Sequence, residues 1–517
     1  MTTAQQLHPE QITEWIRGAV STTAQKNVHL TADSRRINVG DVFIAYPGDT
    51  GDGRDYIAQA IQAGASAVIF EAADEHAACN NISVPHLAVH ELKQQAGSIA
   101  KYWYGQPDQS LFSVAVTGTN GKTSCTQWIA QALSRDAVPT AVIGTLGSGL
   151  FKQGEVNHFE QTGYTTPDAV QLQRQLATNK QAGAKACAIE ASSIGLDQGR
   201  LNALHIDVAV LTNFTRDHLD YHGNMAAYEA AKSRLFDWPT LTHVVINLDD
   251  AMGSRLLEHV RKKFPALTIF AYTIEGAVSP ENILMLSAKE IRITQNGMSF
   301  QLITPFGQAQ IRSHVIGRFN VSNMLAVAGV LFARGLTLQK ITTLLESLLA
   351  IPGRMQQLGG VEAPLAVIDY AHTPDALEKT LHTLREVANE REGALWCVFG
   401  CGGDRDPGKR PQMGAVACAA DQLVITSDNP RSEDPTHIIQ QIVSGIPETV
   451  QQKPEVIPDR ASAILYAIRH AEKNDVVLIA GKGHENYQEI KGRRLAFLDA
   501  DHAALALATC ATRHGGH

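Results

Sequence analysis

The sequence predicts an α/β protein of three domains, built around a central ATPase-type domain with a mainly parallel sheet. Short apolar runs alternate with helical stretches, and each run ends in a polar cluster; the runs of the middle region are "SVAV", "TAVIG", "ACAIE", "DVAVLTNF" and "HVVIN". Such an alternation is typical of a parallel sheet covered on both faces. Ligands bind such sheets beyond the carboxyl ends of the strands, where these polar clusters lie.

The domain boundaries follow from changes in this pattern. Residues 1–106 mix short strand-like runs with helical stretches, and residues 105–110 ("GQPDQS") have the composition of a linker. Residues 267–313 indicate extended strands with turns. After "IPGRM" at 351–355 the pattern of strand and polar cluster returns. We therefore expect domains at 1–106, 107–351 and 352–517, the last a smaller, Rossmann-like α/β domain.

Length and composition narrow the class of protein. A chain of 517 residues is too long for one core, and 44% hydrophobic with 19% charged residues is ordinary for a globular protein. A net charge of −8 disfavours a general nucleic-acid binder. The sequence shows no secretory signal and no apolar run of about 18 residues. Seven cysteines without a CxxC pair indicate reduced thiols. We expect a cytoplasmic protein with no nucleic-acid partner and no membrane insertion.

The stretch "SVAVTGTNGKTS" at 113–124 predicts a phosphate-binding loop (P-loop). It departs from the pattern G-x-x-x-x-G-K-[ST], which requires glycine where this chain has Val116. Gly118 and Gly121 still allow backbone N–H groups to approach a phosphate. Lys122 can neutralise phosphate charge, and the Thr123 hydroxyl can bind Mg²⁺. The alternative is a glycine turn before an ordinary helix, but the preceding strand and the G-K-T-S ending favour phosphate binding.

Three further residues are candidates for a functional role, and each could also be an ordinary structural residue. Glu190 follows the apolar run "CAI", so it is either a metal ligand or a charge at a strand end facing water. His218 is a lone histidine. From the residues alone, Lys232 is expected to be an exposed helical lysine.

The loop "TGTNGKTS" is similar to the ATP loop of the Mur ligases and the related folylpolyglutamate synthases. The motifs "TNFTRDHLDYHG", "YEAAK", "GRFNVSN", "GRM", "DYAHTPDAL", "FGCGGDRD", "DNPR" and "GKGHE" extend the resemblance over nearly the whole chain. They resemble the Mur ligases that add the third amino acid of the peptidoglycan stem. The resemblance implies three domains and an ATP-dependent joining of a carboxylate to an amine through an acyl phosphate.

The resemblance also implies the residues that bind ATP and Mg²⁺. Glu190 and His218 match the Mg²⁺ positions, with Thr123, and Lys232 matches a lysine that CO₂ converts to a carbamate bridging to a second Mg²⁺. Lys122 is central among the ATP contacts, which are Gly118, Thr119, Asn120, Gly121, Lys122, Thr123, Ser124, Asn320, Arg354 and Asp369.

The UDP-sugar substrate, UDP-N-acetylmuramoyl-L-alanyl-D-glutamate, is expected on the first two domains. Two residues depart from the family pattern: Tyr164 replaces a frequent Asn, and Ile194 replaces the His of "SSHGL". The first puts one substrate contact in doubt, and the second suggests that the histidine is dispensable. The positions that match substrate contacts are Ala32, Ser34, Asp49, Thr50, Gly51, Tyr164, Thr165, Thr166, Ser192, Gln198 and Arg200.

The incoming amino acid is expected on the last domain. We predict meso-diaminopimelate rather than lysine, because the Arg431 guanidinium can bind the extra carboxylate in fork geometry. An unpaired buried guanidinium supports a discrimination of roughly 10⁴ against lysine. The alternative is that Arg431 forms a salt bridge with Glu433 or Asp434. The residues that match this site are Arg405, Asp428, Asn429, Pro430, Arg431, Gly481 and Glu485.

Two other interpretations remain open from the sequence. One is another ligase of the superfamily, such as a folylpolyglutamate synthase, which would lack "DNPR" and the domain with "DSRR". The other is a nucleotide-dependent switch without ligase chemistry. We expect a monomer whose partners are small-molecule substrates.

Overall fold

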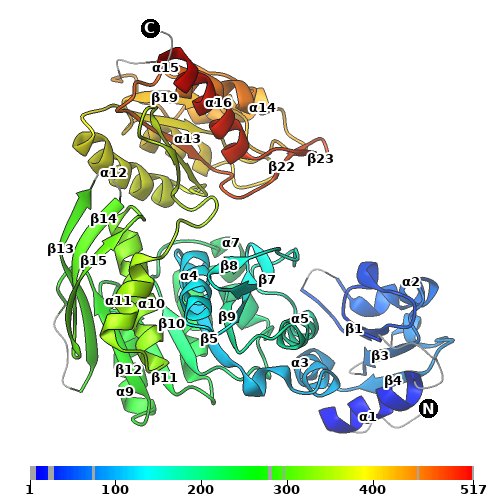
Figure 1. The fold of residues 1–517 in the computed structure, drawn as a ribbon. Helices are drawn as coiled ribbons and strands as arrows, with labels where there is room; N and C mark the ends of the chain where they lie inside the picture. Colours follow the sequence, from blue (N-terminus) through cyan, green and yellow to red (C-terminus); the bar gives the residue numbers. More distant parts are fainter. Residues whose placement is uncertain are drawn as a thin grey trace. The chain divides into compact units, whose positions relative to one another are not determined.

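The computed structural model describes residues 7–20, 28–49, 51–72, 76–277, 282–294, 297–450 and 453–514, with residues 510–514 described by their backbone alone. The chain divides into two compact units, residues 1–287 with 323–337 and residues 288–322 with 338–517. The division falls within strand β13 (Leu284–Thr294) and within helix α10 (Arg318–Ala333) (Figure 1). The three-domain boundaries given above stay a prediction.

The first unit begins with a parallel four-stranded sheet of order β1-β2-β3-β4. Successive side chains of β2 point to opposite faces: Val42 and Ile44 pack in the cluster that includes α1 and α3, whereas Phe43 and Ala45 pack with α2. The run "VFIA" is therefore apolar throughout because both of its faces are covered. The elements are α1 (Pro9–Val20), β1 (Leu30–Thr31), β2 (Val42–Ala45), α2 (Ile57–Gln62), β3 (Ala67–Glu71), β4 (His86–Val89) and α3 (Leu92–Trp103).

The segment with linker composition is ordered and partly buried. Residues Pro107–Ser110 form a short 3-10 helix, and Asp108 is fully buried. Its carboxylate accepts hydrogen bonds from Lys101 Nζ at 2.9 Å and from the backbone N–H of His205 at 2.6 Å. The ion pair with Lys101 compensates the buried charge, so this segment is attached to its surroundings.

The large sheet confirms the predicted parallel arrangement. In the first unit its strands run in the order β13-β12-β11-β10-β5-β9-β6-β7-β8, and the pairings from β12 to β6 are parallel. Residues of α5 and α9 pack on one face with Ala141 and Ile143 of β6, and Ala130 of α4 packs with Val142 on the other. The strands and helices are β5 (Phe112–Thr117), α4 (Lys122–Arg135), β6 (Thr140–Gly144), β7 (Gly147–Lys152), β8 (Glu155–Val156), α5 (Ala169–Gln181), β9 (Ala186–Glu190), α6 (Ser193–Asp197), β10 (Val208–Leu211), α7 (Leu219–His222), α8 (Met225–Ser233), β11 (His243–Asn247), α9 (Ala251–Lys263) and β12 (Thr268–Thr273).

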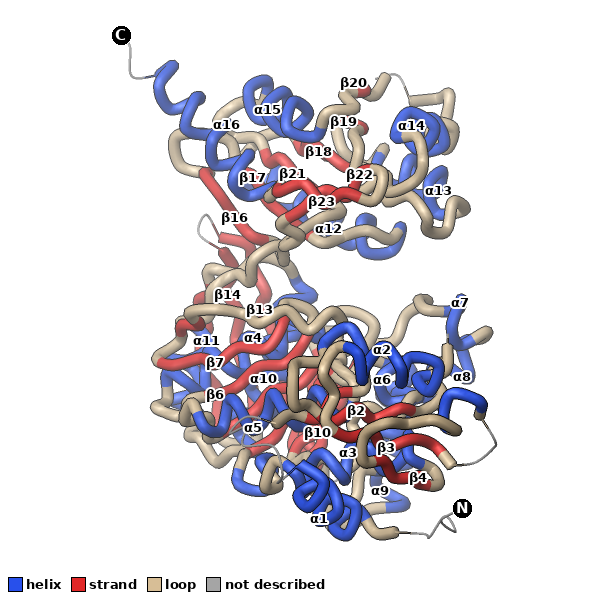
Figure 2. Tube along the Cα trace, turned by 90° about the vertical axis from the view of Figure 1, so that its right-hand side faces the viewer, coloured by secondary structure: helices blue, strands red, loops and turns tan. Residues whose placement is uncertain are grey.

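The second unit contains a six-stranded sheet of order β16-β17-β21-β18-β19-β20, parallel except for β16. Helices α12, α13 and α14 cover one face and α15 and α16 the other (Figure 2). The elements of this unit, besides parts of β13 and α10, are β14 (Gly297–Thr304), β15 (Gly307–Ser313), α11 (Leu338–Glu346), β16 (Gln356–Gly359), β17 (Leu365–Asp369), α12 (Pro374–Glu390), β18 (Leu395–Phe399), α13 (Lys409–Ala417), β19 (Gln422–Ile425), α14 (Pro435–Val443), β20 (Glu455–Val456), α15 (Arg460–His470), β21 (Val476–Ala480), β22 (Tyr487–Ile490), β23 (Arg493–Ala496) and α16 (Asp499–His514).

Within the described part of the chain, every helix is too short or too polar to cross a membrane.

Candidate active site

The predicted phosphate loop joins β5 to α4, as the sequence indicated. Gly118 has φ +146°, and a Cβ there would lie 1.9 Å from Thr212 Oγ1. Gly121 has φ +84°, and a Cβ there would lie 2.5 Å from Asn323 Oδ1. Both positions therefore require glycine for backbone conformation and for space. The turn places the N-terminus of α4, with its backbone N–H groups, at the carboxyl end of β5.

The amino groups of two lysines converge on this loop. Lys122 Nζ donates to Gly118 O at 2.9 Å and to Thr119 O at 2.8 Å. Lys232 Nζ, from α8, donates to the same Gly118 O at 2.8 Å. The Lys122 ammonium makes the loop an electropositive site, which favours an anion.

Lys232 is buried, with 1% of its surface exposed, so the expectation of an exposed lysine is wrong. The cause is that α8 turns the face bearing Tyr228 and Lys232 inward; the ammonium lies 4.5 Å from the Tyr228 ring centroid. Burial and the neighbouring Lys122 hold the pKa of Lys232 well below its usual value, against the opposing effect of Asp217. The neutral amine is therefore favoured more than at an exposed lysine.

Glu190 lies at the carboxyl end of β9, beside the loop, and is fully buried. The alternative of a strand-end charge facing water is thus wrong. Its Oε2 accepts hydrogen bonds from Thr123 Oγ1 and Thr145 Oγ1, both at 3.0 Å, and its Oε1 accepts one from Thr145 N at 2.9 Å. The structure brings Glu190 and Thr123 together, two of the four predicted metal ligands.

His218 lies in a left-handed backbone conformation, with φ +52°, at the start of α7. Its Nε2 is 3.5 Å from Asp217 Oδ2. Its ring lies edge-on to the Tyr228 ring, with 6.2 Å between the two ring centroids. Burial lowers the pKa of His218, as do Lys122 and Lys232, while Asp217 opposes the shift. In the described residues, no group of three or more His, Cys, Asp or Glu side chains is arranged around a common metal position.

Several of the residues predicted for the UDP-sugar substrate form a continuous polar network in the first unit. Gln198 Nε2 donates to Asp49 Oδ2, and Lys93 Nζ pairs with Asp49 Oδ1 at 2.9 Å. Arg200 Nε donates to Gln198 Oε1 at 2.7 Å, and its Nη1 donates to Thr166 O at 2.7 Å.

The network continues to the carboxyl end of β9. Thr166 Oγ1 donates to Glu190 O at 2.6 Å and contacts Ser192 Oγ at 2.9 Å. The Thr165 hydroxyl lies 3.1 Å from the Thr145 hydroxyl, which itself contacts Glu190. Thr166, Ser192 and Thr165 are thus joined by hydrogen bonds to the phosphate-loop side of the sheet.

The remaining substrate candidates lie at the periphery of this network. Tyr164 is 56% exposed, and the Arg200 guanidinium lies 4.8 Å from its ring centroid. Ser34 is buried at the start of a 3-10 helix that follows Ala32. Gly51 follows Asp49 in an exposed loop, and Thr50 lies outside the described residues.

In the second unit, Asp369 ends β17 and is surrounded by backbone donors. Its Oδ2 accepts from Met355 N at 2.8 Å and its Oδ1 from Ala371 N at 2.9 Å. Burial raises the pKa of Asp369, and the nearby Arg354 opposes that shift. The Arg354 guanidinium lies 4.6 Å from the Tyr370 ring centroid. The structure brings Arg354 and Asp369 together, and Asn320, buried in α10, donates to Ile316 O at 2.8 Å.

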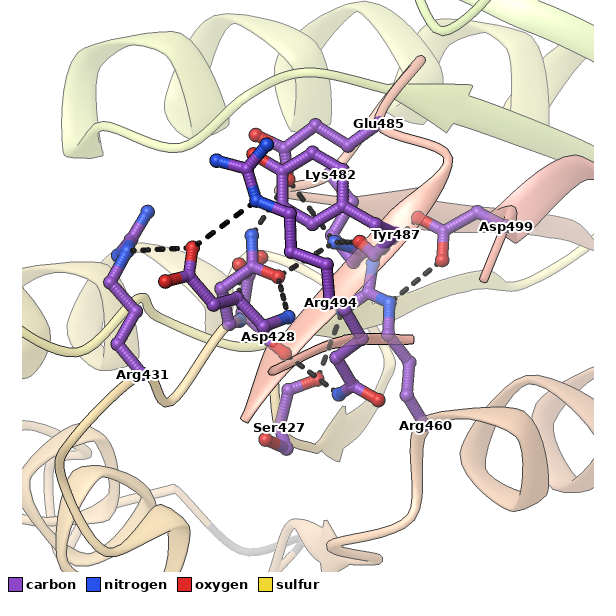
Figure 3. A network of polar contacts seen from close by, with 12 residues as sticks. Ser427, Asp428, Arg431, Arg460, Lys482, Glu485, Tyr487, Arg494 and Asp499 are labelled. Carbon is purple, nitrogen blue, oxygen red and sulfur yellow. Dashed lines mark hydrogen bonds and ion pairs between the residues drawn. The ribbon is translucent and has the colours of Figure 1, made fainter. Parts of the chain in front are cut away.

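The loops after β19 and β21 bring together most of the residues that are predicted to bind the incoming amino acid (Figure 3). Asn429 Nδ2 donates to Glu485 Oε2 at 2.7 Å. Asp428 is 8% exposed, and a Cβ on Gly481 would lie 2.6 Å from its Oδ2. Gly481 has φ +110°, so this turn requires glycine to leave room for the carboxylate.

Arg431 lies beside Glu489 rather than the acidic residues that follow it in sequence. Its Nε is 3.9 Å from Glu489 Oε2, and its Nη1 donates to Gly403 O at 2.6 Å. Glu433 is instead bound by Arg410 at 2.7 Å, and Asp434 caps α14. The alternative that Arg431 forms a salt bridge with Glu433 or Asp434 is therefore wrong.

Two predicted residues flank this group. Pro430 connects Asn429 to Arg431, whose φ of +52° is uncommon outside glycine. Arg405 lies on an exposed loop, and its Nη1 donates to Asp404 O at 3.2 Å.

Lys482, Glu489 and Thr145 are among the residues at these sites that were not predicted from the sequence. Lys482 is fully buried and contacts both Asn429 and Glu485. It lies inside the motif "GKGHE", between two candidate residues, which was the available signal. Thr145 and Glu489 gave no such signal, because their contacts are made between distant segments.

Comparison with known proteins covers almost the whole chain. Models of the Mur ligase family catalytic domain, the Mur ligase middle domain and the Mur ligase glutamate ligase domain match residues 28–104, 116–331 and 353–483. A UDP-N-acetylmuramoyl-L-alanyl-D-glutamate–2,6-diaminopimelate ligase of Janthinobacterium sp. (strain Marseille) is 60% identical over 93% of this chain and 94% of its own length. The ligase of that name from Pseudomonas aeruginosa is 46% identical over 94% and 96%.

A solved structure of a UDP-N-acetylmuramoyl-L-alanyl-D-glutamate–2,6-diaminopimelate ligase has 37% identity and a TM-score of 0.65, covering 93% of this chain and 94% of that one. Matches of this identity and coverage, in sequence and in structure, establish that the chain belongs to the Mur ligase family.

Proposed function

We propose that this chain is an ATP-dependent amide ligase that adds meso-diaminopimelate to UDP-N-acetylmuramoyl-L-alanyl-D-glutamate in peptidoglycan synthesis. The observation that carries the proposal is the 60% identity, over 93% of the chain, with a relative named for that reaction. The phosphate loop and the buried Glu190 beside it supply the groups that ATP chemistry requires.

The reaction proceeds in two steps. The substrate carboxylate attacks the γ-phosphorus of ATP, the bond to the β-phosphate oxygen breaks, and ADP leaves. The amine of diaminopimelate then attacks the carbonyl carbon of the acyl phosphate. The C–N bond forms, inorganic phosphate leaves with its oxygen, and the amine loses a proton. The protein mainly orients the reactants and neutralises charge.

In this proposal Lys122 and the loop from Gly118 to Ser124 bind the ATP phosphates. The observation in support is that Lys122 Nζ is held by carbonyls of that loop, 2.9 and 2.8 Å away. A phosphate oxygen that enters the loop offers this ammonium a charged partner in place of neutral carbonyls. Asn320, Arg354 and Asp369 are also proposed as nucleotide contacts.

Oxygen donors beside the loop fit Mg²⁺. The Thr123 hydroxyl and the Glu190 carboxylate are hydrogen-bonded to each other, and both are ligand types that Mg²⁺ prefers. We propose that Thr123, Glu190 and His218 hold Mg²⁺, with Lys232 after its conversion to a carbamate. Bound there, Mg²⁺ would neutralise the charge of the phosphates.

Lys232 as an amine does not fit a metal ligand set, because an ammonium repels a cation. Its lowered pKa favours the neutral amine, which is the form that attacks CO₂. The N–C bond forms, one proton leaves, and a carbamate with one negative charge results. The proposal of a carbamylated Lys232 rests on this chemistry and on the motif "YEAAK".

The acceptor sites are proposed from the two polar groups described above. The network from Asp49 through Gln198 and Arg200 to Thr166 supports the UDP-sugar substrate site. The group formed by Asp428, Asn429, Arg431 and Glu485, with Arg405, Pro430 and Gly481, is proposed to bind diaminopimelate. The guanidinium of Arg431 provides the cation that the second carboxylate requires.

The domain division at residues 1–106, 107–351 and 352–517 belongs to this proposal, and the three family models, which end or begin near these boundaries, support it. We further propose that the protein is cytoplasmic, since its substrates ATP and a UDP-sugar are cytoplasmic metabolites, and the monomeric state stays a prediction.

The experiment is release of inorganic phosphate from ATP, with UDP-N-acetylmuramoyl-L-alanyl-D-glutamate and a panel of amino acids. We expect release only with the UDP substrate and an amino acid together, and fastest with meso-diaminopimelate. Release that needs a folate and glutamate instead would indicate a folylpolyglutamate synthase. Phosphate release that does not depend on either acceptor substrate would indicate a nucleotide-dependent switch.

A further inference from the structure

The buried ammonium of Lys482 has a complete set of acceptors inside the second unit. Its Nζ donates to Asn429 Oδ1 at 3.1 Å, to Glu485 Oε2 at 3.1 Å and to Tyr487 O at 2.6 Å (Figure 3). Three donors meet three acceptors, and no part of the side chain is exposed. A buried cation is tolerated only with such compensation, so the position specifies lysine.

These contacts determine how Asn429 is oriented. Asn429 Oδ1 accepts from Lys482 Nζ and from Glu489 N at 2.9 Å, so the amide oxygen is directed inward. The amide nitrogen then donates to Glu485 Oε2 at 2.7 Å. Rotation of the amide by half a turn would place an N–H group against the ammonium, which is unfavourable.

Glu485 is oriented by the same set of contacts. Its Oε2 accepts from both Lys482 and Asn429, whereas among the described residues no donor contacts its Oε1. The side chain is 18% exposed, so one oxygen is held inside and the other faces outward. An outward carboxylate oxygen in a fixed position is suited to accept a hydrogen bond from a ligand ammonium.

We propose that Lys482 is a positioning residue for the incoming amino acid: its buried ammonium fixes Asn429 and Glu485 so that one carboxylate oxygen faces the ligand. The inference rests on the proposed function, in which these two residues bind the amino acid. Lys482 does not touch the ligand, because its three donors are taken by the protein.

The test compares Lys482→Met with Lys473→Met, a control that removes an exposed lysine of the same unit, which pairs with Glu362. We expect Lys482→Met to raise KM for meso-diaminopimelate at least about tenfold. KM for ATP and for the UDP substrate should change less than about twofold, as should all three values in Lys473→Met. Thermal unfolding checks that the variants are folded, and Lys482→Gln replaces Lys482→Met should the latter not fold.

A double-mutant cycle separates positioning from a merely structural role. With Glu485→Gln as the second change, Lys482→Met should raise KM for diaminopimelate by less than about threefold, because the group it positions is already altered. An equal effect in both backgrounds, or unchanged KM in the single variant, would overturn the inference. A parent that releases no phosphate with diaminopimelate would overturn the proposed function as well, whereas an active parent with unchanged variants overturns the inference alone.

Discussion

Replacing Arg431 with alanine should remove most of the preference for diaminopimelate over lysine. The two amino acids differ by one carboxylate at the end of the side chain, and Arg431 is the guanidinium in the "DNPR" loop. It is 19% exposed and is held by Gly403 O at 2.6 Å, so its fork is partly ordered before the ligand arrives.

The magnitude follows from the hydrogen bonds that the ligand carboxylate forms and the ion pair that it replaces. Two charge-assisted hydrogen bonds to a carboxylate contribute about 3–6 kcal/mol together. The existing ion pair with Glu489, at 3.9 Å and partly exposed, is worth about 1 kcal/mol at most and is given up. The remainder, about 2–5 kcal/mol, corresponds to a discrimination of about 30- to 5,000-fold. This is smaller than the roughly 10⁴ argued from sequence, because Glu489 already partners the guanidinium.

The assay is kcat/KM for meso-diaminopimelate and for L-lysine, in the parent, in Arg431→Ala and in Arg494→Ala. Arg494 is the matched control, since it also lies 3.9 Å from Glu489 but is 67% exposed. We expect Arg431→Ala to lose activity with diaminopimelate and keep its low activity with lysine, and Arg494→Ala to change neither by more than about threefold. Equal kcat/KM for the two amino acids in the parent would refute the reasoning, as would a full preference in Arg431→Ala.

Three further predictions concern the phosphate loop. Lys122→Ala should lower kcat/KM at least about a hundredfold, while the exposed Lys185→Ala does not, and turnover at the parent rate would contradict the assignment. Lys232→Ala should be nearly inactive and partly restored by short carboxylates; full parent activity in CO₂-depleted buffer would contradict the carbamate. Folding lowers the pKa of Lys232, so between that lowered pKa and pH 10.5 the unfolded chain binds more protons than the folded chain. The free energy of unfolding should therefore rise with pH in this range, by up to about 1.4 kcal/mol per pH unit. The measurement is the midpoint of thermal unfolding of the parent and of Lys232→Met, from pH 7 to 9 in CO₂-free buffer. The same pH dependence in both proteins would exclude this contribution of Lys232.

The sheets and the phosphate loop could be predicted because their signals are local. An apolar run such as "ACAIE" becomes a strand buried on both faces, and Gly118 and Gly121 mark a turn that a Cβ would block. The ion pair that orders Asp108 could not be predicted, since its partner Lys101 and the backbone of His205 come together only in the folded chain. For the same reason, a linker composition did not reveal a buried segment.

The burial of Lys232 had a weak signal that local reasoning did not use. Tyr228 and Lys232 are four residues apart and so share one face of α8, and an aromatic ring on that face favours burial. The direction of that face depends on the segment that carries Thr119, whose hydroxyl lies 3.1 Å from the Tyr228 hydroxyl. Such a contact between residues 109 positions apart cannot be read from a helical pattern.

The two buried lysines differ in what surrounds the amine, and this difference separates their roles. Lys482 pairs with the Glu485 carboxylate at 3.1 Å, so its charge is compensated in place. Lys232 has the neutral Gly118 carbonyl as its hydrogen-bond acceptor, and no carboxylate among the described residues lies within ion-pair distance of it. Burial without a paired charge favours the neutral, nucleophilic amine, whereas burial with a paired charge favours a fixed cation. This difference supports the proposed reaction of Lys232 with CO₂ and the proposed positioning role of Lys482.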